Sequence, residues 1–204
     1  MEFLLNENIQ FYLLAYLVGG IPFGLLLAKI YTSVNIMEEG SGSIGATNVL
    51  RVLKDKDPAL AKKLSIMTLA LDALKGVFVL LIAQALGAED AVLWAIAVLA
   101  VVGHCFSPYL KLEGGKGVAT GMGVSFYMIP IETLVGIIVW FVLAKTVRVS
   151  SLSSMGGLAA VVGMFYFLQP EVAHAPMILI AFFIFYKHIP NFIRLFKGEE
   201  KRVV

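Results

Sequence analysis

Long apolar runs alternate with short polar connections along the whole chain. A helix that spans a bilayer needs about 20 mainly apolar residues, with roughly 17 to 25 tolerated. Runs at residues 9–31, 64–87 and 91–110 meet this length, and shorter runs follow at residues 117–129, 131–147, 153–168 and 171–188. The pattern predicts an all-α, polytopic membrane protein in which some of the helices are short.

Pro130 decides how the middle of the chain is divided. A proline inside a helix removes a hydrogen bond and clashes with the preceding turn. We therefore expect a turn at Ile129–Pro130 and seven transmembrane helices. The alternative is one long, kinked helix over residues 117–147, which would give six.

The placement of Lys and Arg favours seven helices over six. With seven helices and the N-terminus outside, all 16 basic residues lie on the cytoplasmic side, together with the C-terminus. The positive-inside rule describes this arrangement. With six helices, seven of the 16 would move outside, namely Lys145, Arg148, Lys187, Arg194, Lys197, Lys201 and Arg202. The outer connections of the seven-helix topology carry only acids: Glu2, Glu7, Glu89, Asp90, Glu132 and Glu171.

Composition agrees with this assignment. The chain is 59% hydrophobic and 15% charged, whereas soluble domains have about 25% charged residues. One cysteine, Cys105, excludes an intramolecular disulfide, and we expect it to be a buried packing residue. The first Lys or Arg is Lys29, so the N-terminus lacks the basic region of a cleaved signal peptide and we expect the first helix to be retained. We expect a single membrane-embedded domain over residues 1–204.

The first candidate site is GSGSIGATNVLR at residues 40–51. Its glycines match G-x-G-x-x-G, but they follow a membrane helix and not the strand that a dinucleotide-binding turn requires. Glycines let successive backbone N–H groups form an anion-binding nest, hydroxyls and an amide add donors, and Arg51 adds a fork suited to phosphate. A flexible Gly/Ser connector is the simpler alternative. The candidate phosphate-binding residues are Gly40, Ser41, Gly42, Ser43, Gly45, Thr47, Asn48 and Arg51.

The second candidate site is EGGKGVATG at residues 113–121. Gly114, Gly115, Lys116 and Gly117 stand at the start of a predicted helix, and a helix N-terminus with glycines and a lysine suits an anion. Gly117 follows the lysine where a Walker A loop has Ser or Thr, so nothing here indicates ATP. The alternative is an ordinary basic turn on the cytoplasmic side.

The third candidate site is KHIPNFIRLFKGEEKR at residues 187–202. His188, Asn191 and Arg194 are spaced so that a helical turn would present them on one face, although Pro190 makes a regular helix uncertain. The alternative is a basic tail attracted to anionic lipid, which suits Lys197, Lys201 and Arg202 better than it suits His188 and Asn191.

Two ionisable residues, Asp72 and Lys75, lie inside the second long apolar run. Ionisable side chains are costly in a membrane and are functional candidates by default, but this pair could also simply pair with each other or brace the first loop. We expect His104 to be a hydrogen-bonded packing residue. No cluster of His, Cys or carboxylates has metal-ligand spacing, so we expect neither a metal nor another cofactor.

Glycines, hydroxyls and cations thus gather on one side of the membrane in segments that are distant in sequence. A transporter would place its site near the midplane, often between repeated halves, and we see neither feature. Phosphate-bearing substrates at the inner leaflet fit better, with one lipid-like partner and no nucleic acid. A transporter for a phosphorylated metabolite remains the main alternative, and a scaffold that binds anionic lipid is a third.

In this order, GSGSIGATNVLR, GGKGVAT and H-x-x-N-x-x-R-L-x-x-G-x-E closely resemble the signature motifs of the bacterial PlsY family of acyl-phosphate:glycerol-3-phosphate acyltransferases. The likeness extends to IPFG at residues 21–24 and LDALKG at residues 71–76. Two positions differ, because the family commonly has Asn at Ser43 and Lys at Glu113. Since Glu113 reverses a charge, we do not expect that position to be an essential phosphate contact.

The resemblance implies transfer of a fatty acyl group from acyl phosphate to the primary hydroxyl of glycerol 3-phosphate, without a metal, at the bacterial inner membrane with the site on the cytoplasmic side. As catalytic residues we expect His188, Asn191, Lys116 and Arg51, with Arg194 among the binding residues. Either His188 or the substrate's own phosphate would accept the proton. Which loop holds which phosphate stays open.

Overall fold

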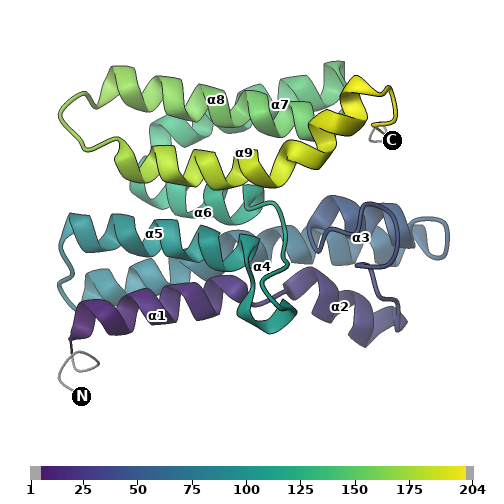
Figure 1. Ribbon diagram of the computed structural model, residues 1–204, viewed down its shortest axis with the longest axis horizontal. Helices are drawn as coiled ribbons and strands as arrows, with labels where there is room; N and C mark the ends of the chain where they lie inside the picture. Colours follow the sequence, from purple (N-terminus) through teal and green to yellow (C-terminus); the bar gives the residue numbers. More distant parts are fainter. Residues whose placement is uncertain (1–5, 201–204) are drawn as a thin grey trace. The chain divides into compact units, whose positions relative to one another are not determined.

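The computed structural model describes residues 6–200, so Glu2, Lys201 and Arg202 lie outside the described residues. Within this range the chain is helical and contains no strand (Figure 1). The elements are α1 (Glu7–Gly20), α2 (Phe23–Thr32), α3 (Ala46–Leu53), α4 (Pro58–Ala85), α5 (Asp90–Cys105), η2 (Pro108–Leu110), α6 (Val118–Met128), α7 (Pro130–Thr146), α8 (Ser150–Leu168) and α9 (Ala175–Phe196). The predicted all-α fold is confirmed, and each apolar run of the sequence forms helix.

The chain divides into two compact units, Met1–Val124 and Ser125–Val204, and the boundary falls within α6. The prediction of a single acyltransferase domain remains a prediction, and the units are described separately below. The expected turn before Pro130 is present, because α6 ends at Met128 and Pro130 begins α7. Proline is well suited to the first turn of a helix, where its missing N–H has no intrahelical partner to lose.

The first unit is built on α1, α4 and α5, which pack against one another. α6 begins in this unit, and Gly123 of α6 comes so close to the backbone of Ala73 in α4 that a Cβ would not fit. By length and apolar character, the segments Glu7–Thr32, Pro58–Ala85 and Asp90–Leu110 can each cross a membrane. These are the three longest runs that the sequence predicts.

The first apolar run is interrupted, which the sequence analysis did not predict. α1 ends at Gly20, Ile21 and Pro22 are not helical, and α2 begins at Phe23. Pro22 lacks an N–H and disfavours helical geometry in the residue before it, so the helix stops here. The break leaves the main-chain carbonyls of Gly20 and Ile21 free to accept from Ser107, just after α5, and from Lys75 of α4.

A separate apolar core lies beneath the loop that follows α2. Ile36 and Ile44 are buried together with Leu64 of α4 and with residues of α2 and α3. Leu110 of η2 packs against the same core. The loop is therefore anchored by its own side chains, as a flexible connector would not be.

The second unit contains the end of α6 together with α7, α8 and α9. α7 packs along α8, where Gly136 and Gly157 let the two backbones approach closely, and α8 packs on α9. Small residues at a helix contact are typical of membrane proteins, where close packing holds helices together. α8 and α9 are each long and apolar enough to cross a membrane.

Several acidic side chains lie at the ends of the helices in each unit. In the first unit, Glu7 and Glu89 line one pocket at the end where α1 begins and α4 ends. In the second unit, Gln169 donates to Glu132 at one end (2.7 Å), and Ser151 donates to Glu200 at the other (3.0 Å). Glu7, Glu89 and Glu132 belong to connections that the sequence-based topology places outside, whereas Glu200 lies at the opposite end of its unit. The orientation in the membrane remains a prediction.

Candidate active site

Asn48 of α3 organises the first glycine loop. Its side chain is buried, with 2% of its surface exposed. Its amide nitrogen donates to the carbonyls of Ile36 and Ser43, each at 2.8 Å, and of Glu39 at 3.2 Å. Its carbonyl oxygen accepts from the backbone N–H of Ser41 at 2.8 Å and from its hydroxyl at 3.1 Å. The Asn48 amide is thus used to shape the loop.

The loop backbone has the conformation that its glycines allow. Gly40 and Gly42 have φ values of +65° and +69°, in the left-handed region that side chains disfavour. Gly45 has an ordinary φ of −82° and precedes α3, where no side chain caps the helix by hydrogen bonding. Ser43 accepts weakly from its N–H at 3.4 Å. The start of α3 therefore presents backbone donors beside the loop.

Arg51 and Thr47 lie on α3 with their side chains at least partly exposed. The Arg51 side chain makes no hydrogen bond or ion pair with any residue from 6 to 200. Its guanidinium can therefore pair with an external anion without breaking an internal contact. This agrees with the phosphate-binding role that the sequence suggests.

The second glycine loop rests directly on His104 at the end of α5. The N–H of Gly115 donates to the His104 carbonyl at 3.0 Å. A Cβ on Gly114 would collide with that carbonyl, and a Cβ on Gly115 would collide with the His104 ring. Gly117 has a φ of +82°, and α6 begins at the next residue. Lys116 is half-buried between these glycines, whereas Glu113 is exposed.

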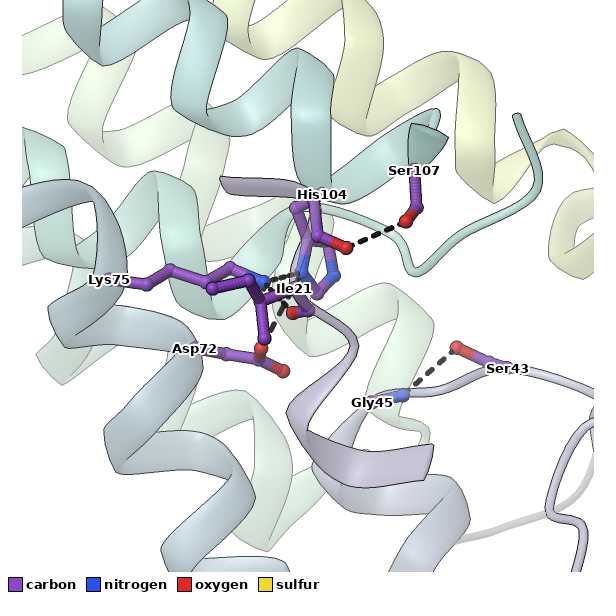
Figure 2. A network of polar contacts seen from close by, with 8 residues as sticks. Ile21, Ser43, Gly45, Asp72, Lys75, His104 and Ser107 are labelled. Atoms are coloured by element: carbon purple, nitrogen blue, oxygen red, sulfur yellow. Dashed lines mark hydrogen bonds and ion pairs between the residues drawn. The ribbon is translucent and has the colours of Figure 1, made fainter. Parts of the chain in front are cut away.

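A buried polar cluster underlies this loop (Figure 2). The Lys75 ammonium lies 2.9 Å from Asp72 Oδ1, 2.8 Å from His104 Nδ1 and 3.0 Å from the Ile21 carbonyl. Asp72 and Lys75 thus pair with each other, which is one of the alternatives that the sequence left open. The expectation that His104 is a hydrogen-bonded packing residue is confirmed, but its two partners, Lys75 and the glycine loop, were not foreseen.

The interrupted helix α1–α2 connects the two loops. Ser107, just after α5, donates to the Gly20 carbonyl at 2.6 Å. Gly24 of α2 lies so close to the Ile44 carbonyl of the first loop that a Cβ would not fit. The first and second candidate sites therefore belong to one connected region of the first unit.

The third candidate site lies in the second unit and forms a cluster of its own. α9 continues through Pro190 to Phe196, so His188, Asn191 and Arg194 do share a helix. His188 and Asn191 are buried, and the ring nitrogen Nδ1 of His188 is 2.7 Å from the Ile184 carbonyl. Because a carbonyl only accepts, Nδ1 carries the proton, and in the neutral ring Nε2 holds the lone pair.

Glu200 binds the other two motif residues. Its carboxylate accepts from Asn191 Nδ2 at 2.6 Å and from Arg194 Nε at 2.9 Å, and Ser151 of α8 donates to it as well. Burial raises the pKa of Glu200, but these hydrogen bonds outweigh it and hold the pKa below its usual range. An ionised Glu200 therefore fixes the end of α9 to α8. The sequence motif contains this glutamate, but its pattern alone did not reveal the contacts.

No group of three or more His, Cys, Asp or Glu residues within 6–200 is arranged to hold a metal ion. Cys105 is buried beneath the second loop, as the sequence predicts. The donors gathered in the first unit are backbone N–H groups, hydroxyls, a lysine and an arginine. Such a set suits phosphate oxygens.

Comparisons with known proteins agree with this chemistry. Residues 9–198 match the family described as glycerol-3-phosphate acyltransferase. Proteins of that name from Sulfurimonas denitrificans and Wolinella succinogenes are 62% and 58% identical to this chain, and in both cases the match covers 100% of each chain.

The fold is also similar to crystal structures of PlsY, an integral membrane glycerol 3-phosphate acyltransferase. Its glycerol 3-phosphate form has a TM-score of 0.86 and 34% identity, over 98% of this chain and 96% of that one. Its lysophosphatidic acid form has a TM-score of 0.84 and the same identity, over 97% and 95%. The family match, the identities and the shared fold show that the chain belongs to the glycerol-3-phosphate acyltransferase family and is an integral membrane protein.

Proposed function

We propose that the protein transfers a fatty acyl group from acyl phosphate to the primary hydroxyl of glycerol 3-phosphate. The products are 1-acylglycerol 3-phosphate (lysophosphatidic acid) and inorganic phosphate, and the reaction is the first acylation step of phospholipid biosynthesis. The observation that carries the proposal is the pairing of two glycine loops with Arg51 and Lys116 in one unit. Both substrates carry a phosphate, and two anion-binding loops match two phosphates.

The chemistry needs no covalent enzyme intermediate. The hydroxyl oxygen of glycerol 3-phosphate attacks the acyl carbonyl carbon, and the bond from that carbon to the phosphate oxygen breaks. The phosphate departs with the electron pair of that bond. Phosphate is a good leaving group, so the reaction needs no covalent activation by the protein. The protein's main tasks are to hold two anions in line and to stabilise the charge that develops on the carbonyl oxygen and on the leaving phosphate.

We assign the second loop, with Lys116 and the backbone of Gly114, Gly115 and Gly117, to one phosphate. Ser41, Ser43, Thr47 and Arg51 of the first loop hold the other or orient the attacking hydroxyl. Asn48 contributes through the loop's shape, since its amide is bonded to the loop backbone. The exposed Glu113 has no phosphate contact in this assignment.

His188 has a role in proton transfer or in positioning. Because its Nδ1 donates to Ile184, its Nε2 is the nitrogen that would accept a proton from the hydroxyl. The alternative base is the phosphate of the substrate itself, in which case His188 positions a reactant. Asn191 and Arg194 are tied to Glu200, and we assign to them the placement of the α9 end that carries His188.

We further propose that the protein resides in the bacterial inner membrane with the N-terminus outside and the loops facing the cytoplasm. The distribution of Lys and Arg along the sequence supports this orientation, because the topology with the N-terminus outside places every basic residue on the cytoplasmic side. The acyl chain of the donor then stays in the inner leaflet while its phosphate reaches the glycine loops.

Charge-neutralising variants distinguish the proposed enzyme from the alternative of a scaffold that binds anionic lipid. In purified protein, Arg51→Gln and Lys116→Gln should each lower glycerol-3-phosphate-dependent phosphate release from acyl phosphate by at least about 100-fold, as expected when a charged transition-state contact is removed. Lys62→Gln is the matched control, because Lys62 is exposed at the start of α4, and it should stay within about twofold. Similar small losses in all three variants would contradict the proposal.

A further inference from the structure

Asp72, Lys75 and His104 form a buried cluster that the proposed reaction does not use. Their exposed fractions are 2%, 4% and 3%, and all lie on helices expected to cross the membrane. Charged groups are costly there and persist where they serve a function. In an Asp–Lys pair each charge already has its counter-charge, so the presence of a histidine beside a glycine loop needs its own explanation.

The hydrogen bonds determine which ring nitrogen of His104 carries the proton. A lysine ammonium has three N–H donors and no acceptor. The Lys75 ammonium has three neighbours in range, Asp72 Oδ1, the Ile21 carbonyl and His104 Nδ1. Nδ1 must therefore accept, and the proton of the neutral ring lies on Nε2. Asp72 Oδ1 is 3.7 Å from Nδ1, too far for a hydrogen bond that would reverse this assignment.

The Nε2 side of the ring faces the second glycine loop. A Cβ on Gly115 would lie closest to Nε2, with Cε1 at 2.8 Å and Cδ2 at 3.0 Å. The same histidine accepts the Gly115 N–H through its main-chain carbonyl at 3.0 Å. His104 thus contacts this loop with both its backbone and its ring, next to Lys116.

The same ammonium also holds the element on which the first loop rests. Lys75 donates to Ile21 at the break between α1 and α2, and it lies 5.8 Å from the centre of the Phe23 ring. One residue further along, Gly24 contacts the Ile44 carbonyl of the first loop. A single buried charge is therefore bonded to the supports of both anion-binding loops.

We propose that Asp72, Lys75 and His104 are positioning residues that set the mutual placement of the two glycine loops, with the His104 Nε2–H group directed at the second loop. The inference rests on the proposed function, because the loops are taken to hold the two reacting phosphates. Each loop alone can still bind its phosphate when the cluster is altered. The cluster matters when both substrates are bound and must be aligned, so its loss should lower kcat more than it raises either KM.

The first test reads the tautomer directly and needs no activity. The chain has only three histidines, so ¹⁵N NMR of protein with labelled histidine in detergent can resolve each ring, with His174→Asn and His188→Asn used to assign the signals. The proposal requires a neutral His104 with its proton on Nε2. His188 serves as the internal contrast, because its contact with Ile184 places the proton on Nδ1. A proton on Nδ1 of His104, or a doubly protonated ring, would overturn the proposal.

The second test compares two variants of His104, each of which keeps only one of the two polar positions of the ring. In His104→Asn, the amide oxygen replaces Nδ1 and keeps the acceptor for Lys75 but leaves nothing at Nε2. In His104→Gln, the amide nitrogen reaches the Nε2 position but the acceptor for Lys75 is lost. If His104 only satisfies Lys75, the Asn variant is the more active. The proposal expects the Gln variant to keep a kcat at least about tenfold above that of the Asn variant, whichever variant melts at the higher temperature.

Thr133→Val is the control for a change at a buried polar side chain away from the cluster, since the Thr133 hydroxyl donates to the Ile129 carbonyl one turn earlier, at 2.9 Å. It should leave kcat and both KM values within about twofold. Equal kcat values in the two His104 variants, or a higher one for Asn, would contradict the inference. If the unaltered protein shows no transfer from acyl phosphate at all, the proposed function fails instead, and the NMR result still decides the tautomer. The NMR test also stands if neither His104 variant folds.

Discussion

Gly115→Ala is the substitution whose effect follows most directly from the geometry. The added Cβ would lie 2.8 Å from His104 Cε1 and 3.0 Å from Cδ2, and nearer still to Nε2. Ordinary non-bonded separations are about 3.5 to 4.0 Å. The ring or the loop must therefore move by roughly 1 Å or more.

The relative strength of the contacts decides which of the two moves. Moving the ring breaks a hydrogen bond from the Lys75 ammonium, which contributes about 1.5 to 3 kcal/mol. Moving the loop breaks the neutral bond between Gly115 and the His104 carbonyl, which contributes about 0.5 to 1.5 kcal/mol. We expect the loop to move and to carry Lys116 with it.

A displacement of about 1 Å at a reacting centre can cost about 100-fold in rate, which corresponds to about 2.7 kcal/mol in the barrier. We therefore expect kcat/KM for acyl transfer to fall by about 100-fold. Overpacking of this kind costs about 1 to 3 kcal/mol of stability, so a thermal melt in detergent should show a lower but cooperative transition. Together, kcat/KM and the melting transition distinguish a folded protein with a displaced loop from an unfolded protein.

Gly163→Ala is the control, because Gly163 lies in α8 and a Cβ there would have nothing within 4 Å. Alanine is favoured over glycine in a helix by about 1 kcal/mol, so this variant should melt no lower than the unaltered protein and keep its activity within about twofold. If Gly115→Ala retains activity within about threefold and its melting temperature is unchanged, the described contact with His104 is wrong.

Three further predictions concern other parts of the site. Gly45→Ala should fold normally, because φ is ordinary and the nearest atom to a Cβ is Ser43 Oγ at 3.8 Å. It should nevertheless lose at least about tenfold in kcat/KM, because the added methyl group would block substrate from approaching the loop backbone. Full activity would show that the first loop is not part of the binding site. His188→Gln should keep measurable transfer if the substrate phosphate is the base, and a loss as complete as that of Lys116→Ala would refute that route. The pKa of Glu200 is lowered in the folded protein, so the ionised carboxylate stabilises the fold fully above its ordinary pKa of 4.5, and this stabilisation is lost as pH falls below that value. Thermal melts from pH 7 to pH 3.5 should therefore show a smaller pH dependence in Glu200→Gln than in the unaltered protein. An unchanged profile would contradict the described contacts.

The sequence was sufficient for the helices but not for their interruption. Apolar length predicted the long helices, and Pro130 correctly marked the division between α6 and α7. The break at Ile21–Pro22 was missed, although Pro22 is a visible signal, because the surrounding residues are as apolar as those of a continuous helix. Helix α3 was also not predicted, because its residues were interpreted as a continuation of the phosphate-binding loop, although Ala46, Val49 and Leu53 follow a helical spacing.

At the site, the sequence indicated which residues carry the chemistry but not which ones hold it in place. Asn48 was expected to contact phosphate, whereas its amide is bonded to the loop backbone at both ends. His104 and the second glycine loop are close in sequence, yet only the folded chain shows the ring filling the place of a Gly115 side chain. Such contacts depend on tertiary packing, which local patterns do not encode.

The central claim is the use of acyl phosphate as the donor, and one measurement tests it most directly. Purified protein is supplied with glycerol 3-phosphate and, in separate reactions, with a fatty acyl phosphate, acyl-CoA or acyl carrier protein donor, all in the presence of EDTA, and the lipid product is identified by mass spectrometry. We predict 1-acylglycerol 3-phosphate with an equal amount of inorganic phosphate from the acyl phosphate reaction alone. Product from a thioester donor and none from acyl phosphate would contradict the account.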